Sequence, residues 1–164
     1  ILGLGRTFEE AAAKAFRFKD SSYPLLRKGD TLFVSLADAD KAKFTATFAE
    51  LQKQGVQFAA TEGTARMLEQ AGIQPSAIIT GPQDFAQLIQ AGNVTLAFIT
   101  ATKGNQHGRT GFALRGLAVQ KGIPMFTAVE TFELYVKALT TKEGTHHDEC
   151  EDIGTLSKIA ITKP

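Results

Sequence analysis

Short apolar runs alternate with stretches of helical periodicity along most of this 164-residue sequence, and that alternation constrains the fold more than any other feature. The apolar runs, each expected to form a strand, are residues 31–36, 56–60, 77–80, 94–100 and 124–128. The helical patterns that follow them cover residues 40–54, 64–70, 84–92, 112–121 and 129–139. Because parallel neighbouring strands need a long crossover, usually a helix, the pattern predicts an α/β fold: a five-stranded parallel sheet with helices on both faces, in three layers.

The chain also has an amino-terminal segment that precedes this pattern. Residues 7–18 are strong helix formers, and Thr7 with Glu10 three places later matches a capping box. Pro24 and Gly29 then mark a linker. We therefore expect a helix and linker over residues 1–28, the α/β domain over residues 29–140, and a polar tail over residues 141–164.

The overall charge excludes some classes of partner. Lys plus Arg number 18 and Asp plus Glu number 17, so the net charge of +1 suggests neither a nucleic-acid partner nor a membrane partner. The single cysteine, Cys150, has no internal partner for a disulfide, and no apolar run approaches the roughly 18 to 20 residues that a membrane-spanning helix needs. We expect a cytoplasmic domain, and the first residue, Ile1, suggests a piece of a longer polypeptide.

Candidate binding residues follow the first two expected strands. In sheets of this kind ligands bind beyond the carboxyl ends of the strands. Ser35 lies near the end of the first strand and Lys41 follows it, and Thr61, Gly63 and Thr64 follow the second strand. Hydroxyl groups, a glycine and the free amides of two helix starts can form a cradle for an anion such as phosphate. Two alternatives stay open: the threonines serve as helix caps, and Lys41 is an ordinary solvated lysine.

Polar residues also follow the third and fourth strands. Thr80 ends the third strand and Thr100 ends the fourth, and Thr102, Lys103 and Arg109 lie in the glycine-rich stretch that follows. Hydroxyls and two cations at the same rim again point to an anionic ligand, although an exposed polar loop would have the same composition.

The sequence offers no clear catalytic or metal motif. His146, His147, Asp148, Glu149 and Cys150 are possible metal ligands, but adjacent residues point in different directions, so we predict a polar tail and no metal site. No nucleophile triad, Walker loop or dinucleotide fingerprint is present, and we assign no catalytic residue.

The segments "GLGRTFEEAAAKA", "VSLADADK", "GVQFAATEGTARML" and "KGIPMFT" resemble the carboxyl-terminal part of the large subunit of carbamoyl phosphate synthetase. The resemblance extends to about Leu139. Residues 1–28 resemble the end of that enzyme's second ATP-grasp half, and the rest resembles its allosteric domain, which shares a Rossmann-like fold with methylglyoxal synthase.

The resemblance implies a regulatory domain that binds a phosphorylated effector such as UMP or IMP. Residues at family positions that hold the effector are Ser35, Lys41, Thr61, Thr64 and Thr102. The parent enzyme would make carbamoyl phosphate from bicarbonate and glutamine-derived ammonia, for pyrimidine and arginine synthesis. ATP and Mg or Mn would serve the parent, with no cofactor in this fragment. The implied partners are the rest of the large subunit, the glutaminase small subunit and a second copy of this domain.

Three positions depart from the family pattern. A family lysine appears as Thr80, a family asparagine as Thr100 and a family acid as Thr110, while Lys103 or Arg109 would supply a replacement charge. Two alternatives to a regulatory domain stay open. One is a lyase of the methylglyoxal synthase type acting on dihydroxyacetone phosphate, with a carboxylate base among Asp38, Asp40 and Asp84. The other is a structural or oligomerisation domain without a ligand.

Overall fold

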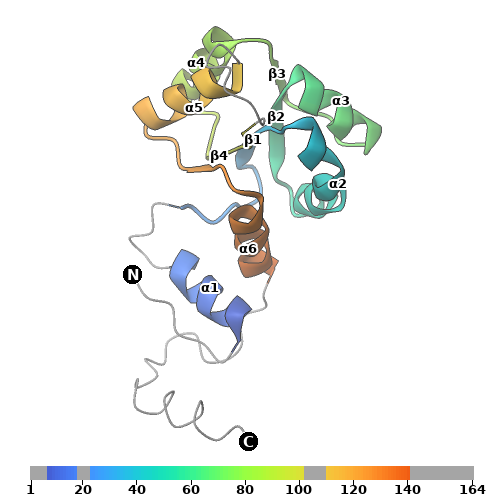
Figure 1. Ribbon diagram of the computed structural model, residues 1–164, viewed down its shortest axis with the longest axis vertical. Coiled ribbons are helices and arrows are strands. Elements are labelled where there is room, and N and C mark those ends of the chain that lie inside the picture. Colours follow the sequence, from blue (N-terminus) through green and yellow to red (C-terminus); the bar gives the residue numbers. More distant parts are fainter. Residues whose placement is uncertain (1–6, 18–22, 102–109, 141–164) are drawn as a thin grey trace, which may run out of the picture. The chain divides into compact units, whose positions relative to one another are not determined.

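The computed structural model describes residues 7–17, 23–101 and 110–140 (Figure 1). The chain divides into two compact units, Ser22–Glu133 and a smaller one made of Ile1–Ser21 with Leu134–Pro164. In the described parts of the chain, no helix has the length and apolar character needed to cross a membrane.

The larger unit is built on a five-stranded sheet in which every pairing is parallel. Its strands are β1 (Thr31–Ser35), β2 (Gln57–Thr61), β3 (Ala77–Ile79), β4 (Leu96–Ile99) and β5 (Met125–Phe126). The spatial order is β3-β2-β1-β4-β5, so the direction in which strands are added reverses beside β1. The prediction of a five-stranded parallel sheet is confirmed, and the reversal places the expected ligand edge at the carboxyl end of β1.

Helices cover both faces of this sheet. Figure 1 shows α4 (Pro82–Gln90) and α5 (Thr110–Gln120) on one side, with α2 (Asp38–Lys53) and α3 (Glu62–Gln70) on the other. A further helix, α6 (Val129–Thr140), follows β5, and α1 (Phe8–Arg17) lies in the smaller unit.

Aromatic side chains fill the space between the sheet and the helices. On one face Phe33 of β1 contacts Phe85 of α4, with ring centroids 4.1 Å apart. On the other face Phe98 of β4 stacks on Phe132 of α6 at 4.0 Å and meets Phe44 of α2 edge-on at 4.9 Å. Burial on both faces explains why the strands read as continuous apolar runs in the sequence.

In the smaller unit, α1 begins as the sequence predicts. The backbone N–H of Glu10 donates to the hydroxyl of Thr7 at 3.1 Å, which confirms Thr7 as the cap. Phe16 and Tyr135 meet edge-to-face with ring centroids 5.5 Å apart.

Four helices of the larger unit begin two residues earlier than predicted, at Asp38, Glu62, Pro82 and Thr110. The predicted starts were wrong because polar residues and proline suit loops but are equally well tolerated in the first turn of a helix. In this chain they form first helical turns. Gly63 and Thr64 therefore belong to the first turn of α3, and their backbone is helical.

Candidate functional site

Three hydroxyl groups meet at the carboxyl edge of the sheet. Ser35 ends β1 and Thr61 ends β2, and the two strands run in parallel register. The Thr61 hydroxyl oxygen lies 3.3 Å from that of Ser35 and 3.3 Å from that of Thr64, which is fully buried. The fold thus brings together three of the residues expected to bind a ligand; we call them the hydroxyl cluster.

Two buried threonines hold the loop between β1 and α2 in place. The backbone N–H of Leu36 donates to the Thr64 hydroxyl at 3.0 Å, and that of Ala37 donates to the Thr100 hydroxyl at 2.8 Å. Each hydroxyl accepts in these bonds and keeps its own proton for a second partner. The loop that carries α2 and Lys41 is therefore fixed to both α3 and the end of β4.

The alternative that these threonines act as helix caps is not supported. Thr61 occupies the cap position of α3 but makes no side-chain capping hydrogen bond. Thr64 uses its hydroxyl for Leu36, which lies 28 residues away. The two hydroxyls hydrogen-bond to each other within the hydroxyl cluster.

Lys41 lies against the first turn of α3. Its ammonium nitrogen is 3.0 Å from the position that a Cβ at Gly63 would take, and 2.6 Å from Oδ1 of Asp38. Only 21% of the Lys41 side chain is exposed, against 95% for Asp38. This placement argues against an ordinary solvated lysine. The hydrogen bond from Lys41, together with its charge, lowers the pKa of Asp38.

A groove of about 520 Å³ runs from this lysine between α2 and α3. Its lining includes Asp38, Lys41 and Gly63, and also Arg66, which the sequence reasoning missed. Arg66 follows Gly63 by three residues on α3, a spacing that places both on one helix face and could have revealed it. The groove therefore carries two cations and one exposed carboxylate.

Thr80 forms its hydrogen bonds with Asp84 of α4. Its hydroxyl and its backbone N–H donate to Oδ2 of Asp84 at 2.5 and 3.0 Å, and the N–H of Gly81 donates to the same oxygen at 3.3 Å. The hydrogen bond from the Thr80 hydroxyl, followed by those from the backbone, lowers the pKa of Asp84. Thr80 and Asp84 thus organise the start of α4.

Each acid considered as a lyase base has a partner of its own. Asp84 accepts the three hydrogen bonds at the start of α4, and Asp38 pairs with Lys41. Asp40 lies 3.9 Å from the ammonium of Lys43.

Thr102, Lys103 and Arg109 lie outside the described residues, as does the cluster at residues 146–150. Thr110 is the exposed first residue of α5.

Comparisons with known proteins agree with this fold. Carbamoyl phosphate synthase large chains of Clostridium perfringens (strain 13 / Type A) and Clostridium botulinum (strain Alaska E43 / Type E3) are each 32% identical, over 92% and 99% of this chain. The chain spans only 14% and 15% of their lengths. The crystal structure of methylglyoxal synthase from Elizabethkingia anophelis NUHP1 has the same fold, with a TM-score of 0.53, 16% identity, and 80% of this chain and 92% of that one covered.

These similarities confirm the resemblance seen in the sequence. A family model described as an MGS-like domain matches residues 43–127, from the middle of α2 to the residue after β5. That span is more than half of the sequence and contains Thr61, Gly63, Thr64 and Thr100. The chain therefore belongs to the MGS-like domain family.

Proposed function

We propose that this chain is the effector-binding regulatory domain of a carbamoyl phosphate synthase large chain. The similarity to such large chains runs over nearly all of this sequence but only about a seventh of theirs, which fits a domain within a larger enzyme. Synthesis of carbamoyl phosphate with ATP and Mg or Mn would then belong to the remainder of the enzyme. The rest of the large chain, a glutaminase subunit and a second copy of this domain are its proposed partners.

The observation that carries the proposal is the position of Lys41 over Gly63. The ammonium lies at the start of α3, where the helix dipole favours a negative guest, and the next residue, Thr64, belongs to the hydroxyl cluster. A phosphate has several acceptor oxygens and up to two negative charges, so it can bind an ammonium, hydroxyl protons and helix amides together. Lys41, Ser35, Thr61 and Thr64 are the proposed phosphate ligands.

Arg66 offers a second cation for the same effector. The resemblance implies a lysine at the position of Thr80, and the Thr80 hydroxyl instead donates to Asp84. The groove shared by Lys41 and Arg66 extends away from the first turn of α3 and has room for the remainder of a nucleotide. We therefore place the sugar or base of the effector along this groove, with Arg66 near the phosphate.

Binding here would couple to regulation through α2 and α3. The effector would touch both helices, and the loop before α2 is fixed by Thr64 and Thr100. Regulation additionally requires that the effector bind more tightly to one state of the enzyme than to another. The lyase alternative gains no support from Asp84, which is committed to the start of α4.

Calorimetric titration of the 164-residue chain tests the proposal directly. UMP, IMP and phosphoribosyl pyrophosphate are the probes, and uridine and inosine are the controls without phosphate. We expect saturable binding of at least one phosphorylated probe and none of the nucleosides. Lys41→Met should weaken that binding by roughly tenfold, the scale of one charge-assisted hydrogen bond.

Lys43→Met is the matched control because Lys43 lies on the same helix and 56% of its side chain is exposed. It should leave the affinity unchanged. Absence of heat with every phosphorylated probe would contradict the proposal and favour a structural domain, whose self-association is measured by analytical ultracentrifugation. Formation of methylglyoxal from dihydroxyacetone phosphate would instead establish the lyase alternative.

A further inference from the structure

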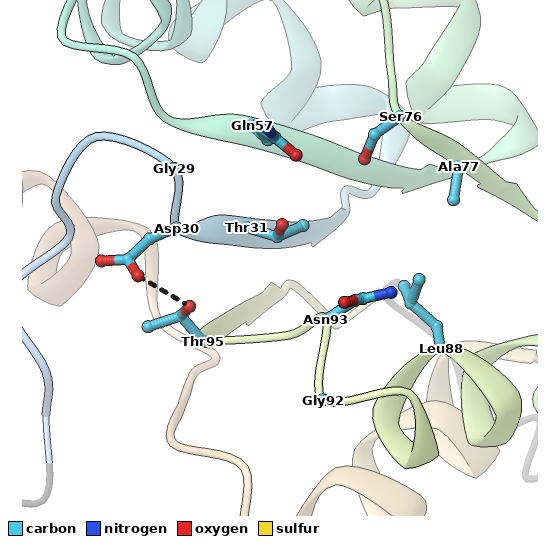
Figure 2. A pocket seen from close by; sticks show the side chains of 10 residues that line it. All are labelled: Gly29, Asp30, Thr31, Gln57, Ser76, Ala77, Leu88, Gly92, Asn93 and Thr95. Carbon is cyan, nitrogen blue, oxygen red and sulfur yellow. Dashed lines mark hydrogen bonds between the residues drawn. The ribbon is translucent and has the colours of Figure 1, made fainter.

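A second pocket, shown in Figure 2, opens at the amino edge of the sheet. The hydroxyl cluster lies at the other end of the strands, where β1 and β2 finish. Its volume is about 350 Å³. Its polar lining residues come from β1, β2 and the turns before β1, β3 and β4: Asp30, Thr31, Gln57, Ser76, Asn93 and Thr95. Nothing in the proposed regulatory function uses this pocket.

The pocket exists because the residues at the amino ends of three neighbouring strands are polar and lie beyond the apolar core. Phe33, Ala59 and Ala97 belong to the core cluster on the face covered by α4 and α5. Two residues earlier along the chain come Thr31 of β1, Gln57 of β2 and Thr95, which directly precedes β4 and donates its N–H to the carbonyl of Thr31. α4 ends at Gln90, and the chain turns at Gly92, where φ is +71°, so these polar residues line the pocket.

Thr31 is the residue that most needs an external partner. Within the described parts of the chain, three polar residues are buried: Thr31, Thr64 and Thr100. The hydroxyls of Thr64 and Thr100 accept backbone N–H groups. Thr31 is only 8% exposed and lines the pocket between Gln57 and Thr95. Among the described residues, its hydroxyl has no hydrogen-bond partner.

An unpaired buried hydroxyl is unfavourable, so its position at the centre of a polar pocket points to a ligand. The main-chain role of Thr31 does not need the hydroxyl. Its carbonyl accepts the N–H of Thr95 at 3.0 Å, a bond that any residue at this position could make.

The chemistry of the lining selects the kind of ligand. The Thr95 hydroxyl donates to Oδ1 of Asp30 at 3.2 Å, and the Ser76 hydroxyl donates to the carbonyl of Phe58 at 3.0 Å, so both present lone pairs to the pocket. Asp30 adds a carboxylate, and the ten lining residues include no lysine, arginine or histidine. The pocket therefore has an excess of acceptors and a negative formal charge.

We propose that this amino-edge pocket binds a small molecule that is rich in hydrogen-bond donors and carries no anionic group, with Thr31 at its centre. Polyols and primary amines share this chemistry. The amides of Gln57 and Asn93 supply both donors and acceptors at opposite sides of the pocket, and Leu88 supplies an apolar wall.

Nuclear magnetic resonance of the 164-residue chain provides the test. The side-chain amide signals of Gln57 and Asn93 are followed while xylitol, 1,3-diaminopropane or inorganic phosphate is added. We expect saturable shifts with xylitol or with the diamine. The probe that saturates shows whether the ligand's donors are the hydroxyl groups of a polyol or the amino groups of an amine. Phosphate should leave both signals unchanged.

Thr31→Val separates a ligand-binding role from a structural one, because valine has nearly the same shape and, like threonine, is favoured in strands. This variant should lose affinity at least fivefold while its thermal midpoint stays unchanged or rises. Thr31→Ser should keep most of the affinity, and Thr45→Val, on α2, should keep all of it. Equal shifts with phosphate, no saturable shift with either donor-rich probe, or a lower midpoint of Thr31→Val with unchanged affinity would each overturn the proposal.

Discussion

The ammonium nitrogen of Lys41 lies 3.0 Å from the point that a Cβ at position 63 would occupy. The lysine can approach the helix this closely because Gly63 has no side chain. The backbone at Gly63 is helical and lies outside the left-handed region. A side chain at this position would crowd the Lys41 ammonium, whereas the turn itself would accept another residue.

Gly63→Ala should separate binding from stability. The added methyl group would make the lysine ammonium shift by a few tenths of an ångström and weaken binding of a phosphorylated effector by up to roughly tenfold, where tenfold is the scale of one whole charge-assisted contact. The free energy of unfolding should stay within about 1 kcal/mol of the parent chain, because alanine favours the helix and the displaced group is the end of a flexible side chain. Calorimetry and urea unfolding measure the two quantities.

Gly116→Ala is the matched control for that variant. Gly116 is an exposed helical glycine of α5, and a Cβ there would have no atom within 4 Å. We expect unchanged effector affinity and a gain in stability of up to about 1 kcal/mol. Equal losses of affinity in both variants would mean that Lys41 does not hold the effector.

Periodicity made the fold predictable, since each strand and helix is a local pattern and parallel order follows from the crossovers. The helix starts were less predictable, because Asp38, Glu62 and Pro82 suit loops and first helical turns equally well. The pairing of Thr80 with Asp84 spans four residues and was in reach of a capping argument.

Contacts that depend on strand register were out of reach. Thr64 binds the backbone of Leu36 across 28 residues, and Thr100 binds that of Ala37 across 63. Composition marks such threonines as candidates, but only the folded sheet shows which hydroxyl accepts which N–H. The amino-edge pocket was hidden for a related reason, since it depends on where α4 ends relative to Thr31.

Thr64→Val should destabilise the chain. The buried N–H of Leu36 would lose its acceptor, and an unsatisfied buried donor costs about 1 to 3 kcal/mol. Urea unfolding should show this loss with an unchanged slope. Thr64→Ser keeps the hydroxyl oxygen and should lose clearly less; an equal loss in both variants would assign the effect to the missing methyl group and not to the hydrogen bond.

Asp38→Asn should tighten binding of a phosphorylated effector. The Asp38 carboxylate lies 2.6 Å from the Lys41 ammonium and so competes with an incoming anion. Because exposed ion pairs are weak, the expected gain in affinity is roughly two- to fivefold. Calorimetric titration at low and moderate salt measures it. A weaker affinity would show that Asp38 orients Lys41 for binding and does not compete.

The start of α4 should make stability depend on acid pH through Asp84. The hydrogen bonds from Thr80 and Gly81 lower the pKa of this carboxyl in the folded chain below its ordinary value. A depressed pKa in the folded state means that the contribution to stability is complete above the unfolded-state value, about 4, and is lost as pH falls through the folded-state value. Between pH 5 and pH 2.5 the thermal midpoint of the parent chain should therefore fall more steeply than that of Asp84→Asn. Thr80→Val, which removes the largest cause of the shift, should lie between the two, and parallel curves for all three chains would show that Asp84 titrates alike in the folded and unfolded states.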